Sequence, residues 1–151
     1  MQIRGMKMKK VYIIAGGRSY LGLENSMYRH IPAELLGAET LKLLLKKTRG
    51  IIDPERIDGI LAGNGVGAGG NIGRLMMLEA GLPQKIPAAT IDGQCGSGLE
   101  ALGMAAAKIM SGMGSLYIAG GFESSSTAPR RKYHENHQLF YQFFNKVSQK
   151  V

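Results

Sequence analysis

The sequence has no tryptophan and only one cysteine, Cys95, among its 151 residues. A single thiol excludes an intramolecular disulfide, so a reducing, intracellular compartment is the expected location. Long apolar runs are missing too, because no stretch approaches the roughly 18 apolar residues that a membrane-spanning helix needs. The apolar run over 11–15 is also too short for the core of a signal peptide. We therefore expect a cytoplasmic protein with no membrane partner.

Acidic residues are scarce at both ends of the chain, and the net charge of +8 comes from there. Residues 1–10 carry four basic groups and no acid, and residues 129–151 carry five basic groups and one acid. The part between them is neutral, with ten groups of each sign. Because nucleic-acid-binding domains carry a basic patch on their surface, we expect no nucleic-acid partner. The charges divide the chain into a basic leader (1–10), a domain (11–129) and a divergent basic and aromatic tail (130–151).

Short apolar runs alternate with longer segments that have the periodicity of helices. Strands are expected over 10–15, 59–63, 86–91 and 115–119, and helices over 32–49, 71–80 and 95–111. This βαβαβαβ order predicts an α/β fold with a mainly parallel sheet covered by helices. Ligands of such sheets bind beyond the carboxyl ends of the strands, which directs attention to the loops over 64–70 and 92–95.

Cys95 stands where a predicted strand ends and a predicted helix begins. The positive end of a helix and its free N–H groups stabilise a thiolate, so the position suits a nucleophile. Gly93, Gly96 and Gly98 surround the cysteine, and glycine allows a substrate to approach the sulfur closely. These three glycines are the candidates for the substrate loop. The alternative interpretation is that Cys95 is a small buried hydrophobic residue, as single cysteines often are.

The segment GQCGSGLEALGMAA, over 93–106, resembles the nucleophile motif of thiolases, the acetyl-CoA C-acyltransferases. Five further segments resemble that family in the same order, namely VYIIAGGRSYLG (11–22), LLGAETLKLLL (35–45), ILAGN (60–64), NIGRLMMLEAGLP (71–83) and IAGGFESSSTAP (118–129). The chain departs from the family pattern at Ser19-Tyr20, and it has Phe122 and Ser125 where the family has methionine.

The resemblance implies that Cys95 takes an acyl group from acyl-CoA as a thioester, with its own backbone N–H helping to form an oxyanion hole. Coenzyme A then enters as part of the substrate, so neither a cofactor nor a metal is expected. Thiolases consist of two similar halves packed into five αβαβα layers and function in fatty acid metabolism. The C-terminal half supplies a histidine that activates the sulfur and a second cysteine that moves the α-proton.

This chain looks truncated relative to that family, because it ends where the family's loop domain begins. His30, His134 and His137 match none of the family's catalytic positions. A nucleophile without its base should be weak, so we expect the isolated chain to be inactive or weakly active. The expected partners are acyl-CoA and either further copies of the chain or a separate C-terminal half.

Two other functions remain open on the sequence alone. Gly65-x-Gly67-x-x-Gly70 fits a dinucleotide-binding motif between a strand and a helix, and Asp92 ends the next strand. The chain could instead be a non-catalytic interaction fragment that self-associates through an exposed apolar surface. In that case the basic, aromatic tail could contact nucleic acid or an anionic membrane.

Overall fold

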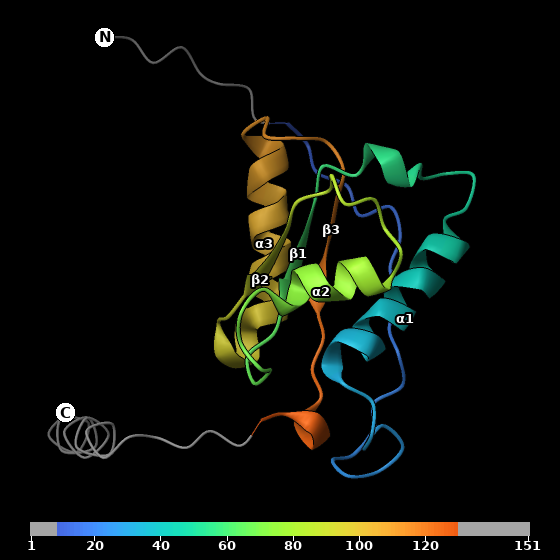
Figure 1. Cartoon of the computed structure of the whole chain (residues 1–151). Helices are drawn as coiled ribbons and strands as arrows, with labels where there is room; N and C mark the ends of the chain where they lie inside the picture. Colours follow the sequence, from blue (N-terminus) through green and yellow to red (C-terminus); the bar gives the residue numbers. More distant parts are fainter. Residues whose placement is uncertain (1–8, 130–151) are drawn as a thin grey trace, which may run out of the picture.

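The computed structural model describes residues 9–129 as a three-stranded sheet with helices on both faces (Figure 1). In chain order the elements are α1 (Ala33–Lys47), the 3₁₀ turn η1 (Pro54–Arg56), β1 (Gly59–Gly63), α2 (Ile72–Glu79), β2 (Ala88–Ile91), the 3₁₀ turn η2 (Gln94–Gly96), α3 (Ser97–Met110), β3 (Tyr117–Gly121) and the 3₁₀ turn η3 (Ser125–Thr127). The predicted tail and most of the predicted leader lie outside the described residues. Within those residues, no helix combines the length and the apolar character needed to cross a membrane.

The three strands are parallel and follow the order β2-β1-β3. Ile60 in the central strand pairs with Ala88 on one side and with Ile118 on the other. Parallel neighbours need crossover connections, and α2 and α3 provide them. The predicted α/β class with a parallel sheet is therefore confirmed, and all three strands end at the same edge of the sheet.

Alternate residues of β1 face the two helical layers. Ile60 and Ala62 belong to the core cluster that includes residues of α1 and α2, whereas Leu61 packs with Ala101 and Ala105 of α3. Alternation of this kind follows from the two-residue period of a strand. Figure 1 shows α3 on one side of the sheet and α1 and α2 on the other.

The apolar run over 10–15 does not form the predicted strand, so the prediction of four strands was wrong. Its side chains are open to solvent, with Tyr12 72% and Ile13 88% exposed. The physical reason is that none of the three strands pairs with this segment. Strand propensity alone does not form a strand, because the backbone groups need a neighbouring strand to bond.

β3 begins at Tyr117, two residues later than predicted, because a carboxylate takes the preceding N–H groups. One side-chain oxygen of Asp58 accepts hydrogen bonds from the backbone N–H of Ser115 (2.7 Å) and of Leu116 (3.0 Å). These bonds join the segment before β3 to the residue before β1. The start of β3 is thus set by a residue far away in the sequence.

Candidate active site

Cys95 lies in η2, the tight turn between β2 and α3, and its side chain is exposed. The α-helix itself begins at Ser97, two residues after the predicted start. In the described part of the chain, Cys95 is therefore open to solvent and not packed as a small buried hydrophobic residue. The cysteine still precedes the first turn of α3, where the partial positive charge of the helix favours an anion.

Hydrogen bonds on both sides of Cys95 hold this turn in shape. Ser97 is buried, and its Oγ donates to the Gln94 carbonyl (2.6 Å) and accepts from the Gly93 N–H (2.9 Å). The Gln94 N–H donates to the Asp92 carboxylate (3.0 Å). Gln94 has φ +53°, a left-handed conformation that costs energy outside glycine and persists only where its surroundings hold it.

Glycines at the ends of β1 and β3 let α3 approach the sheet closely. A Cβ on Gly63 would lie 2.5 Å from the Ser97 carbonyl oxygen and from the Gly98 nitrogen. A Cβ on Gly98 would lie 3.3 Å from the Cα of Gly121 in β3. The start of α3 therefore contacts the strand ends backbone to backbone, and Gly98 faces the sheet.

The other two candidate glycines, Gly93 and Gly96, lie in the turn on either side of Cys95. A Cβ on Gly93 would make an ordinary contact of 3.7 Å with Ser97, and one on Gly96 would meet nothing within 4 Å. Of the three predicted substrate-loop glycines, Gly96 has open space at its missing Cβ, but only Gly98 lines the same cavity as Cys95.

A second polar group, which the sequence analysis missed, lies at the same edge of the sheet. The Glu123 carboxylate, just after β3, accepts hydrogen bonds from Asn64 Nδ2 (2.9 Å), the Gly65 N–H (2.9 Å) and the Val66 N–H (3.0 Å). Asn64 directly follows β1 and is buried. The available signal was that both polar residues follow adjacent parallel strands, whose ends meet in space.

This carboxylate bears on the dinucleotide alternative. A phosphate cradle needs free backbone N–H groups, but Glu123 occupies those of Gly65 and Val66, and the Asn64 side chain accepts from Gly67 (3.0 Å). The negative Glu123 carboxylate beside the loop would also repel a phosphate. The geometry of the glycine-rich loop therefore disfavours dinucleotide binding.

Cys95, Asn64 and Glu123 all line a cavity of about 690 Å³. Its further walls come from the loop before α1, from α1 and from β3. The segment after β3 lies beside the loop before α1 (Figure 1), and Ser124 Oγ joins them by donating to the Ile31 carbonyl (3.1 Å). An exposed thiol thus faces a cavity at the carboxyl edge of the sheet, where the sequence analysis expected the chemistry.

Asn71 and Arg74, two polar residues of the family-like segment over 71–83, have structural contacts. Asn71 caps α2 by accepting from the Arg74 N–H (3.1 Å), and its Nδ2 donates to the Ala88 carbonyl (2.8 Å). The Arg74 guanidinium donates to the Ile86 carbonyl (2.5 Å). These bonds fasten α2 to the segment that leads into β2.

Histidine does not complete a catalytic pair in the described part of the chain. His30 does not line the cavity, and its Nε2 accepts a hydrogen bond from Arg29 (3.0 Å). His134 and His137 lie outside the described residues. Among residues 9–129, no group of three or more His, Cys, Asp or Glu side chains is placed to hold a metal ion.

The fold and the site together define an α/β domain that presents a cysteine at a strand-to-helix turn. Comparison with known families is specific: residues 11–148 match the family model described as "Thiolase, N-terminal domain". The chain belongs to the thiolase family.

Relatives of known name cover the same region. The chain is 42% identical over 117 residues to YhfS of Bacillus subtilis, which is named as a candidate acetyl-CoA C-acetyltransferase, and 43% identical over 122 residues to VraB of Staphylococcus aureus, named likewise. These alignments cover 78% and 81% of this chain but 31% and 32% of those proteins. A crystal structure of the Bacillus anthracis acetyl-CoA acetyltransferase superposes with a TM-score of 0.68 at 29% identity, over 76% of this chain and 29% of that one. The chain therefore spans about a third of the length of its relatives.

Proposed function

We propose that this chain carries the acyl-accepting cysteine of an acetyl-CoA C-acyltransferase, and that Cys95 is the residue acylated. The observation that carries the proposal is the exposed thiol before the first turn of α3, facing a cavity. The names of the relatives support acyl-CoA as the substrate. We place the activity in cytoplasmic fatty acid metabolism, with no cofactor beyond the thioester itself.

In the proposed step, the Cys95 sulfur attacks the thioester carbonyl of acyl-CoA. The new carbon–sulfur bond replaces the bond to coenzyme A, which leaves as its thiol with the proton that Cys95 has lost. Negative charge develops on the carbonyl oxygen of the tetrahedral intermediate, and backbone N–H groups of the turn are suited to stabilise it. The turn is preformed by the Ser97 hydrogen bonds, so little reorganisation is required.

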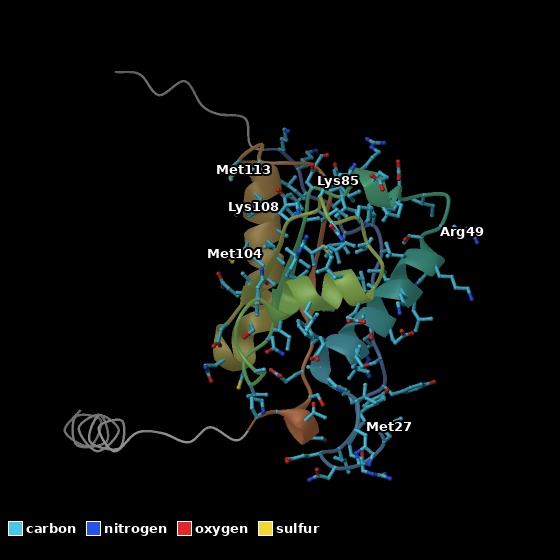
Figure 2. All side chains as sticks on the ribbon, viewed as in Figure 1. Met27, Arg49, Lys85, Met104, Lys108 and Met113 are labelled. Carbon is cyan, nitrogen blue, oxygen red and sulfur yellow. The ribbon has the colours of Figure 1, made fainter. Side chains whose placement is uncertain are left out.

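Sustained turnover is proposed to need the histidine and the second cysteine that thiolases carry in their C-terminal half. We propose that the chain works with a partner, which is either a second copy of the chain or a separate C-terminal half. The outer face of α3 supports a partner, because Leu99 is 76% and Leu102 45% exposed. Figure 2 labels Met104 on the same helix, where it is 38% exposed. Leu99 and Leu102 are three residues apart and share one face of α3, and exposed apolar groups on one helix face are typical of interaction surfaces.

Mass spectrometry of the chain after incubation with acetyl-CoA tests the role of Cys95. We expect one acetyl adduct, mapped to Cys95 by peptide analysis, and no adduct in Cys95→Ala. Little or no catalytic turnover should accompany it, because the activating base is supplied from elsewhere.

The matched control is Ser111→Ala, which removes a hydroxyl nucleophile at the far end of α3. This variant should become acetylated to the same extent as the unaltered chain. An adduct on any residue other than Cys95 would overturn the assignment, and no adduct under any condition would favour the non-catalytic interaction fragment.

A further inference from the structure

Glu123 is exposed, yet both of its carboxylate oxygens are used within one loop. Oε1 accepts from Asn64 Nδ2, and Oε2 accepts from the N–H groups of Gly65 and Val66. Hydrogen bonds to an ionised acceptor are stronger than those between neutral groups. The carboxylate therefore holds the loop after β1 against the segment after β3.

That loop also rests against the turn that carries Cys95. A Cβ on Gly65 would lie 3.2 Å from the Gln94 carbonyl oxygen and 3.3 Å from the Gln94 Cα. Gln94 directly precedes Cys95 and has the left-handed backbone, φ +53°. A backbone in that conformation depends on the contacts around it. Withdrawal of Gly65 would remove one of those contacts.

We infer that Glu123 is a positioning residue for Cys95, acting through Gly65 and Gln94. It does not touch the sulfur; it sets the shape of the turn that places the thiol before α3. A role of Glu123 in catalysis rests on the proposed function, but the structural link from Glu123 to the Cys95 turn does not. This position requires an acceptor on both sides of the side chain, because N–H donors face both oxygens of Glu123. A carboxylate provides two acceptors, whereas an amide has an acceptor on one side only.

The test compares Glu123→Gln with Glu79→Gln in the full chain. Glu79 is an exposed residue at the end of α2, so its variant loses the same charge away from the site. Because Cys95 is the one cysteine, the alkylation rate with iodoacetamide reports this thiol alone. We expect Glu123→Gln to slow alkylation at neutral pH roughly threefold or more, the size of a helix-terminus effect on a charge. The Glu79→Gln rate should equal that of the unaltered chain.

Backbone amide NMR separates positioning from general destabilisation. In Glu123→Gln, the shift changes should extend to the amides of Gln94, Cys95 and Gly96. Glu123→Asp keeps the charge and should recover part of the alkylation rate. Unchanged amides at 94–96 together with an unchanged rate would overturn the inference.

A second variant covers the case in which Glu123→Gln does not fold. Gly65→Ala leaves Glu123 in place but puts a methyl group against Gln94, and it should also alter the Cys95 alkylation rate. An unaltered rate in Gly65→Ala would count against the coupling. Alkylation requires no acyl transfer, so failure to acetylate would sink the proposed function without affecting this inference.

Discussion

Glycine at single positions decides how closely α3 approaches the sheet. Gly63 and Gly121 end two strands, and both meet the first turn of α3 through backbone atoms. Gly103, on the exposed side of the same helix, has nothing within 4 Å of its missing Cβ. The same residue type is therefore required at one position and replaceable at another.

Gly63→Ala should destabilise the chain by about 3 kcal/mol or more, because the new methyl group would overlap the backbone of Ser97 and Gly98. Gly103→Ala should stabilise it by roughly 0.5–1 kcal/mol, because glycine is a poor helix former. Urea unfolding followed by circular dichroism measures both. Equal effects of the two substitutions would contradict the close approach seen at Gly63.

At the scale of elements, Asp58 joins the beginnings of β1 and β3. The hydrogen bond from the Ser115 N–H, followed by that from Leu116, holds the pKa of Asp58 below its ordinary value of 3.8. Burial and the nearby Asp58 charge raise the pKa of Tyr117 above its ordinary value of 10.0. Both shifts arise where the two strands begin side by side.

A carboxyl group whose pKa is lowered by folding stabilises the fold above its unfolded pKa. The Asp58 contribution should be complete at neutral pH and should disappear as the pH falls below about 3.8 through the folded value. Asp58→Asn should accordingly lower the melting temperature at pH 7, and the difference from the unaltered chain should shrink as the pH falls below about 3.8.

Thermal unfolding followed by circular dichroism across this pH range measures the difference, with Glu79→Gln as the control for loss of one charge. A difference that stays constant with pH would contradict the role given to the Asp58 carboxylate.

Most elements could be predicted because their signals are local. The strand over 59–63 has the predicted bounds, and the Asn71 cap of α2 and the approximate span of α1 agree with the sequence patterns. The run over 10–15 has the same apolar character but forms no strand. Its outcome depends on a pairing partner, which no local pattern specifies.

The candidate site divides in the same way. The sequence predicts the place of Cys95 at a strand-to-helix turn, because the strand pattern ends and the helix pattern begins there. The bonds of Glu123 to Asn64 and Gly65 were not, since these residues are far apart in the sequence and meet only when β1 and β3 pair.

At the scale of the whole molecule, the described part of the chain leaves much apolar surface open. Ile13, Leu99 and Met113 are each more than 60% exposed. The chain also spans about a third of the length of its relatives. On α3, the exposed side chains of Leu99 and Leu102 are suited to be buried against another surface.

We expect the chain to self-associate with rising concentration and expect Leu99→Glu to weaken that association. Burial of a leucine side chain contributes about 1.5–3 kcal/mol, so the dissociation constant should rise roughly tenfold or more. Leu43→Glu is the matched control, because Leu43 is 65% exposed on α1 and outside the α3 face. Sedimentation velocity over a concentration series measures the effect. Unchanged association in Leu99→Glu would exclude α3 as the contact surface.

The sequence by itself determined the α/β class, the position of most helices and strands, the strand-to-helix setting of Cys95 and the resemblance to thiolases. All of these follow from periodicity, capping and motif order, which are properties of neighbouring residues. Only the tertiary structure decided that 10–15 stays unpaired, that Gly98 packs on Gly121 and that Glu123 holds the loop behind Cys95. The reason is physical: strand pairing, close backbone contact and a shared carboxylate each need two distant segments to meet.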